Sequence, residues 1–236
     1  MTDRAAVLLD VDGTLVDSVP QHVVAWWKAF RDVDRVVATS DITALIGLGS
    51  TQLTQQLLER SGGGSDDEEL IGRLKNAHTH YYGPWLEQVV ALPGAVDLLR
   101  RCADAGLAVV LTSSADDEEK TVLQRALADG LDVVTAFLSS DDVEGSKPEP
   151  DAFEQARAEA GAERDRCAGL GDAVWDVRSA RNAGVPCLGV LSGGAGEEQL
   201  RGEGALEVYG GVADLLEQFD ASALGRLARG ESLPTP

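Results

Sequence analysis

The stretch that decides the fold is Leu8–Ser18, with the sequence LLDVDGTLVDS. An apolar run over residues 5–9 ends abruptly in polar residues, which is the pattern of a buried strand that meets a turn. Because side chains alternate along an extended chain, Asp10 and Asp12 lie on one side and Val11 on the other. Two such carboxylates could hold Mg²⁺, which prefers oxygen ligands, or could form an ordinary solvated acidic turn.

The composition of the 236 residues restricts the class of protein. A formal net charge of −20 argues against nucleic acid or an anionic membrane as a partner. No apolar run is long enough for a signal peptide or a membrane span. The cysteines are scattered through apolar segments, which indicates reduced core thiols in a cytoplasmic protein; they are Cys102, Cys167 and Cys187.

The order of predicted elements divides the chain into two parts. From residue 92 onward, apolar runs of strand length alternate with amphipathic segments of helix length, which is typical of a parallel sheet covered by helices. Between residues 19 and 91 there are helical patterns but no strong strand. We therefore predict a Rossmann-like α/β core from residues 1–18 and 92–236, and an inserted α-helical cap domain from residues 19–91.

The boundaries of these elements follow from periodicity and from Gly and Pro positions. Predicted helices cover residues 20–32, 41–46, 51–61, 66–82, 94–105, 116–128, 150–160, 174–183, 197–203 and 212–219. Predicted strands after the first cover residues 107–111, 136–139, 166–170, 187–191 and 206–208. In the first helix, Val23, Trp27 and Phe30 recur at helical spacing and are expected in the core. Residues 229–236 are expected to form a frayed tail.

Polar motifs follow several of the predicted strands. Asp10 follows the first strand, Thr112 the second and Asp172 a later one, while Lys147 precedes a helix. Ligands of such sheets bind beyond the carboxyl ends of the strands. We therefore expect these four side chains to lie close together around one ligand.

These motifs, in their order along the chain, resemble those of the haloacid dehalogenase superfamily. The matching segments are Asp10-Val11-Asp12-Gly13-Thr14, Thr112, Gly145-Ser146-Lys147-Pro148, and Gly171-Asp172 with Asp176. The resemblance covers nearly the whole chain and is strongest to hydrolases similar to phosphoglycolate phosphatase and β-phosphoglucomutase, which carry a helical cap after the first motif. It implies a Mg²⁺-dependent phosphatase that hydrolyses a small phosphorylated metabolite through an aspartyl phosphate.

The resemblance also implies a role for each acidic residue. Asp10 would be the nucleophile and a metal ligand. Asp12 would protonate the leaving oxygen and later take a proton from water, while its backbone carbonyl would bind Mg²⁺. Asp172 would be the third protein ligand of the metal. Asp176, one helical turn further on, would orient Lys147 or a water on the metal, or would be an ordinary exposed acid in the first turn of a helix.

The remaining candidates would bind phosphate. Lys147 would offset the charge that builds up as Asp10 and the phosphate approach each other. The hydroxyl of Thr112 and the N–H of Ser113 would donate to phosphate oxygens, and Ser114 is expected to cap the following helix. The backbone amides from Val11 to Gly13 are expected to bind phosphate as well.

Residues of the predicted cap would contact the rest of the substrate. Ser50 follows the Ile-Gly-Leu-Gly segment that relatives carry near the active site, and it could contact substrate or cap the next helix. His22 is close enough to the first motif to approach the substrate. His78 and His80 have no partner pattern and are expected on a helix surface.

Two other functions remain open on the sequence. One is a phosphomutase that returns the phosphate to a sugar, and the other is a non-catalytic binding or regulatory protein that keeps the fold. The complete set Asp10, Asp12, Thr112, Lys147 and Asp172 argues against the second. The sequence does not specify the phosphate ester, and it leaves open whether the protein is a monomer or a homodimer.

Overall fold

The computed structural model describes residues 4–142 and 145–236. Its centre is a six-stranded sheet in which all neighbouring strands run parallel, in the order β3-β2-β1-β4-β5-β6. The strands are β1 (Ala6–Asp10), β2 (Ala108–Thr112), β3 (Ala136–Leu138), β4 (Cys167–Gly171), β5 (Cys187–Val190) and β6 (Glu207–Tyr209). The predicted α/β fold class is therefore confirmed, and each predicted strand lies within about one residue of its observed bounds.

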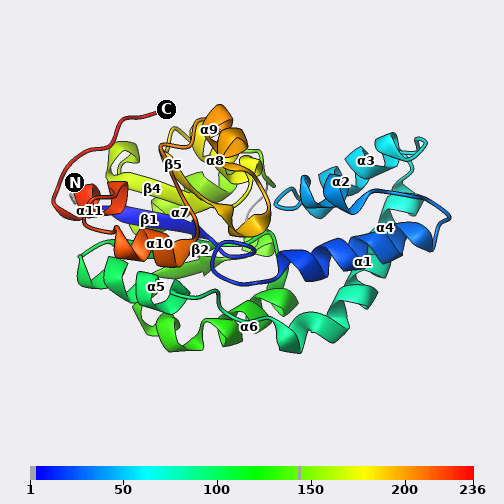
Figure 1. Cartoon of the computed structure of the whole chain (residues 1–236), viewed down its shortest axis with the longest axis horizontal. Coiled ribbons are helices and arrows are strands. Elements are labelled where there is room, and N and C mark those ends of the chain that lie inside the picture. The colour runs from blue at the N-terminus through cyan, green and yellow to red at the C-terminus, as the bar shows by residue number, and fades with distance from the viewer. Residues whose placement is uncertain (1–3, 143–144) are drawn as a thin grey trace.

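Helices cover both faces of the sheet and form a separate group beyond one of its ends (Figure 1). They are α1 (Val19–Arg31), α2 (Thr39–Thr43), α3 (Ser50–Arg60), α4 (Glu68–Tyr82), α5 (Ala95–Asp104), α6 (Asp117–Ala126), α7 (Asp151–Ala160), α8 (Val174–Asn182), α9 (Glu197–Glu203), α10 (Val212–Glu217) and α11 (Ala223–Ala228). Short 3₁₀ helices cover Gly83–Gln88, Ala128–Val133, Ser140–Asp142, Arg164–Arg166 and Leu191–Gly193. Within the described residues, no helix has the length and apolar composition needed to cross a bilayer.

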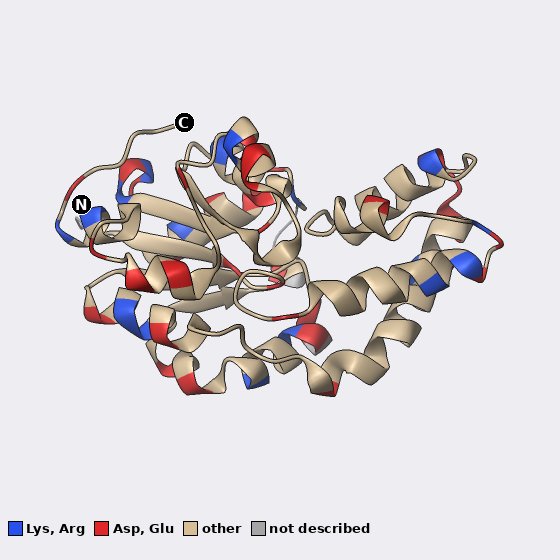
Figure 2. Ribbon diagram, viewed as in Figure 1, with Lys and Arg blue, Asp and Glu red and all other residues tan. Residues whose placement is uncertain are grey.

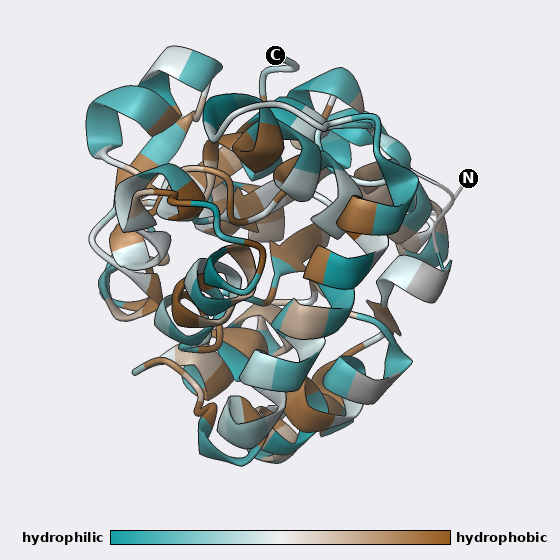
Figure 3. Ribbon diagram, turned by 90° about the vertical axis from the view of Figure 1, so that its right-hand side faces the viewer, coloured by the Kyte–Doolittle hydropathy of each residue, from teal (hydrophilic) through white to brown (hydrophobic). Residues whose placement is uncertain are grey.

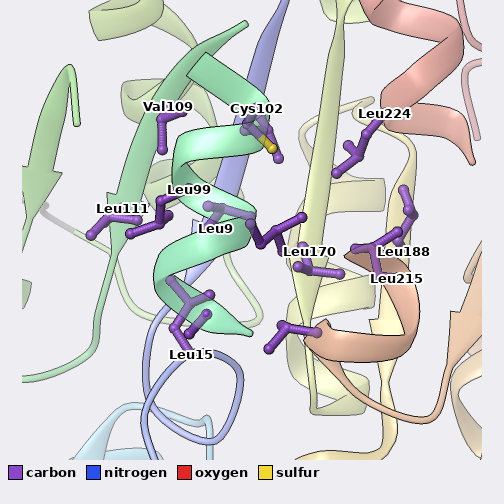
Figure 4. Packing of buried hydrophobic residues seen from close by; sticks show 14 of the residues in the cluster. Leu9, Leu15, Leu99, Cys102, Val109, Leu111, Leu170, Leu188, Leu215 and Leu224 are labelled. Atoms are coloured by element: carbon purple, nitrogen blue, oxygen red, sulfur yellow. The ribbon is translucent and has the colours of Figure 1, made fainter. Parts of the chain in front are cut away.

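The continuous apolar run of β1 is explained by burial on both faces of the sheet. Val7 and Leu9 pack into a cluster with residues of α5, α10 and α11, some of which Figure 4 shows. Ala6 and Leu8 point the other way and pack against α7 and α8. Since both faces are covered by helices, neither set of side chains is polar. This packing fixes the strand that ends at Asp10.

Helices α1, α3 and α4 enclose an apolar core of their own, which includes Phe30, Leu57 and Leu74. Figure 3 views the molecule from the end at which these helices lie. Their ribbons alternate between hydrophobic and hydrophilic segments, as those of amphipathic helices do. The chain enters and leaves this group through two adjacent segments, since Asp17 N–H donates to Val90 O (2.9 Å) and Leu92 N–H donates to Leu15 O (2.8 Å). The division into a core and a cap domain stays a prediction.

Three sequence expectations were wrong. Trp27 is 37% exposed, whereas its neighbour Trp26 is 3% exposed and belongs to the core of the helical group. The chain after residue 219 forms α11, and the expected frayed tail is anchored: Leu233 is buried and its N–H donates to Asp165 O (3.0 Å). His78 is half-buried among aromatic rings and is not a surface residue.

Candidate active site

The candidate site lies at the carboxyl ends of β1, β2 and β4, at the edge of the sheet that faces α1–α4 (Figure 1). Acidic segments gather at this edge (Figure 2). Asp10 ends β1 in register with Thr112 at the end of β2, and Asp172 directly follows β4. Lys147 reaches the same point from the loop before α7. The structure thus brings together the four residues that the sequence placed around one ligand.

Lys147 lies between two buried carboxylates. Its Nζ contacts Asp10 Oδ1 and lies 2.6 Å from Asp176 Oδ1. Burial alone would lower the pKa of Lys147, but the two carboxylates more than offset it and raise the pKa, so the lysine stays charged. Burial, reinforced by the charge of Asp176, raises the pKa of Asp10 to about 7 despite the lysine. Asp176 is 1% exposed, which rules out an ordinary exposed acid.

Asp172 is tied to Asp10 by the buried hydroxyl of Thr14. Thr14 Oγ1 lies 2.6 Å from Asp172 Oδ1 and 3.1 Å from Asp10 Oδ2. Asp176 is held in turn by the backbone N–H of Ala173, which donates to its Oδ2 (2.9 Å). Sequence reasoning assigned no role to Thr14, although it belongs to the first motif.

Two glycines leave the space that the Asp172 carboxylate occupies. A Cβ on Gly13 would lie 2.6 Å from Asp172 Oδ2, and the φ of +79° at this residue also favours glycine. A Cβ on Gly193 would overlap the same oxygen. The φ of Gly193 lies outside the left-handed region, so its backbone would accept any residue and only the missing side chain matters.

Replacing Gly193 by Ala is therefore expected to displace Asp172 and to lower kcat/KM about 10- to 100-fold, because small displacements of reacting groups have effects of this size. The matched control is Gly196→Ala, since a Cβ there meets only Gln199 Oε1 at 3.4 Å. Activity of both variants on one phosphate ester is the measurement. Equal activities would show that Asp172 has room for the added methyl group.

The carboxylates of Asp10, Asp172 and Asp176 could hold a metal ion. Each offers an oxygen, these oxygens lie within 4.8 Å of one another, and all three residues are buried. Burial and the charges of Asp10 and Asp176 raise the pKa of Asp172 well above its usual value. Three buried carboxylates beside one lysine leave an excess of negative charge, which a divalent cation would neutralise. Oxygen donors alone suit a hard cation such as Mg²⁺.

The carboxylate of Asp12 does not belong to this cluster. It accepts hydrogen bonds from Ser18 Oγ and Ser113 Oγ, both at 2.7 Å, and its Oδ1 lies 3.8 Å from His22 Nε2. Burial acts to raise the pKa of Asp12, but His22 and the two hydroxyls more than offset it and lower the pKa. Any contact of Asp12 with the cation would therefore involve its backbone carbonyl.

Several expected phosphate donors are already used within the protein. The N–H of Ser113 donates to Leu138 O (3.0 Å), and that of Gly13 to Val16 O (2.9 Å). Both expectations are therefore wrong for the backbone, although the Ser113 hydroxyl holds Asp12. The Thr112 hydroxyl lies 3.4 Å from Leu9 O. Val11 has its side chain in the core.

The expected cap Ser114 was wrong, and of the two roles left open for Ser50 the structure excludes the cap. Asp116, not Ser114, caps α6, since the N–H of Glu119 donates to its Oδ1 (3.0 Å). Ser50 is the first residue of α3 and Gly49 precedes it as the cap. Ser50 instead lines a cavity that also contains Asp10 and Lys147.

Side chains of the sheet region and of helices α1, α3 and α4 line a cavity of about 600 Å³ beside Asp10 and Lys147. Asp10, Asp12 and Lys147 line its floor, whereas residues of α1 and α4 line the other side. Four rings from these two helices are stacked. The His22 ring lies 3.9 Å from Tyr82 and 5.3 Å from His78 (centroid distances), and His78 lies 5.6 Å from Tyr82 and 4.2 Å from Trp26.

The pKa values of the two histidines in this stack are shifted in opposite directions. His22 Nδ1 and His78 Nε2 are 3.1 Å apart. Burial acts to lower the pKa of His22, but Asp12 and Glu119 more than offset it and raise the pKa. Burial lowers the pKa of His78 to about 2, so this ring is neutral. Both histidines line the cavity, but the sequence pattern did not indicate this for His78, because its partners are far away in the chain. His80 is exposed, as expected.

A parallel sheet with a buried aspartate, a lysine and two further carboxylates at its carboxyl edge is an α/β fold whose acidic site suits a divalent cation. Residues 5–184 match the model of the haloacid dehalogenase-like hydrolases. The chain therefore belongs to this family of hydrolases.

Relatives are similar over most of their length. Phosphoglycolate phosphatase of Rhodospirillum rubrum is 29% identical over 89% of this chain and 88% of its own. Phosphoglycolate phosphatase of Caulobacter vibrioides is 28% identical over 85% of this chain and 84% of its own. A hydrolase from Pseudomonas syringae of known structure is 33% identical, with a TM-score of 0.85, and covers 93% of this chain and 100% of its own. The family expected from the ordered motifs is confirmed.

Proposed function

We propose that the protein is a Mg²⁺-dependent phosphatase that hydrolyses a small phosphorylated metabolite through an aspartyl phosphate on Asp10. The observation that carries this proposal is the position of Asp10, which ends β1 beside Lys147 and beside the carboxylates of Asp172 and Asp176. A nucleophile needs this combination, because a buried carboxylate must approach an anionic phosphate.

The cation would be held by Asp10, Asp172 and the backbone carbonyl of Asp12, and when bound it would neutralise charge on the phosphate. Asp10 attacks the phosphorus atom and the bond to the leaving oxygen breaks. Lys147 stabilises the charge that develops between Asp10 and the phosphate. Asp176 keeps Lys147 in place through their ion pair.

Asp12 would transfer the protons. The lowered pKa favours its ionised form, which takes a proton from the water that hydrolyses the aspartyl phosphate. In the first step Asp12 must instead give a proton to the leaving oxygen. A dianionic phosphate next to Asp12 favours the protonated form, because a like charge raises the pKa of a carboxyl group.

Residues 19–91 would act as a cap that closes over the cavity and excludes water. The stacked rings of His22 and Tyr82 and the residue Ser50 would then contact the leaving group.

The buried, unpaired thiols of Cys102, Cys167 and Cys187 fit a reducing compartment, and we propose a cytoplasmic location.

The test is a screen of phosphate esters, which includes phosphoglycolate, sugar phosphates and nucleoside monophosphates, with Mg²⁺ or with EDTA. We expect free phosphate from at least one ester, and loss of activity in EDTA that added Mg²⁺ restores. A hexose 1-phosphate separates a phosphatase from a phosphomutase, because a mutase would return an isomerised ester. No turnover of any ester would contradict the proposal.

A further inference from the structure

The wall of the cavity opposite the nucleophile carries a lysine that the proposed chemistry does not use. Lys75 lies on α4 and lines the cavity above Asp10. It also lines an adjoining cavity of about 420 Å³ that contains Thr112 and Ser113. Both cavities share Lys147, so Lys75 faces the space directly above the site from the cap side.

Lys75 differs from the other lysine of this cavity in its partners. Lys147 is neutralised by Asp10 and Asp176. Among the described residues, Lys75 has one side-chain partner, the hydroxyl of Thr51, to which Nζ donates at 3.2 Å, and no carboxylate lies within ion-pair distance. In a chain of net charge −20, a lysine without a carboxylate beside it leaves a positive charge directed at the cavity.

The opposite wall carries two acidic side chains near the start of a helix. Asp116 and Glu119, at the start of α6, line the cavity on the side of the sheet domain. An anionic group on the substrate would be attracted to Lys75. The charges therefore orient any substrate that has an anionic group besides its phosphate.

We propose that Lys75 determines specificity by binding a second anionic group on the leaving group, either a carboxylate or a second phosphate. This inference rests on the proposed phosphatase function, because it assumes that the first phosphate lies at Asp10. The preferred substrates are then small phosphate monoesters whose leaving group carries a second anionic group. Phosphate monoesters of the same size with an uncharged leaving group are poorer substrates.

The test compares wild type with Lys75→Met on esters matched in size. Phosphoglycolate is paired with 2-hydroxyethyl phosphate, and a pentose 1,5-bisphosphate with the pentose 5-phosphate. The first pair tests for a carboxylate and the second for a phosphate. For the ester whose leaving group carries the second anionic group, we expect Lys75→Met to lower kcat/KM about 10- to 100-fold, mostly through KM, because a charged hydrogen bond is lost. For the ester whose leaving group is uncharged, we expect kcat/KM to change less than about threefold.

The matched control is Arg73→Met on the same helix, because Arg73 is exposed and does not line either cavity. It should leave both kinds of ester unaffected. One outcome is that wild type hydrolyses the esters while Lys75→Met lowers kcat/KM equally for both members of each pair. The proposed role of Lys75 is then wrong and the phosphatase function stands. If wild type hydrolyses none of them, both proposals fail together.

Discussion

Replacing Asp10 by Asn is expected to lower kcat at least about 10³-fold, because the neutral amide cannot form the acyl phosphate and removal of a nucleophile has effects of this order. The folded protein should keep its stability. The substitution removes a buried carboxylate whose charge opposes those of Asp172 and Asp176, while Lys147 keeps Asp176 as a partner. The measurement is steady-state phosphate release together with the melting temperature.

The control for this variant is Asp17→Asn, which changes an exposed aspartate of the same loop. It should retain the wild-type rate. A loss of activity in Asp10→Asn with an unchanged melting temperature would support a chemical role. Survival of turnover would mean that another residue attacks the phosphorus atom.

Replacing Asp172 by Asn is expected to weaken Mg²⁺ binding at least about tenfold and to lower activity about 10²- to 10³-fold at moderate Mg²⁺. The amide oxygen still accepts the hydrogen bond from Thr14, so the geometry should survive while one negative charge is lost. The half-saturating Mg²⁺ concentration for activity is the first readout.

Thermal unfolding gives a second readout that does not depend on turnover. A ligand at 100 times its Kd stabilises a protein by about 2.7 kcal/mol, which corresponds to several degrees in Tm for a chain of this size. Wild type should show this shift when Mg²⁺ is added, and Asp172→Asn should show little of it at the same concentration. Equal shifts in both proteins would place the cation elsewhere.

The sequence predicted the parts of the site that depend on single strands. Asp10, Thr112 and Asp172 each follow an apolar run, and parallel strands in one sheet bring their carboxyl ends to one edge. Lys147 was predicted from its motif before a helix. These positions depend on local patterns, which is why they could be read without the structure.

The contacts that hold these residues could not be predicted in the same way. Thr14 joins Asp10 to Asp172, which is 158 residues away in the chain. Gly193, in the short 3₁₀ helix after β5, leaves space for Asp172. Neither residue belongs to a pattern that indicates its partner, because each role arises only when distant loops meet.

Backbone donors were mispredicted for a related reason. The N–H groups of Ser113 and Gly13 lie beside the site, but Leu138 and Val16 accept their hydrogen bonds. Periodicity identifies where a strand ends, but it does not indicate which backbone groups keep a partner beyond that end. His78 was assigned to the surface because the rings of His22 and Trp26, which cover it, come from another helix.

The most direct test of the central claim is chemical trapping of the phosphorylated enzyme. Wild type is mixed with its substrate and Mg²⁺, quenched in acid and reduced with borohydride, which converts an aspartyl phosphate to homoserine, and the position is then found by peptide mass spectrometry. We expect homoserine at residue 10, only when substrate is present, and none in Asp10→Asn. Homoserine at another aspartate, or trapping that persists in Asp10→Asn, would contradict the assignment of Asp10 as the nucleophile.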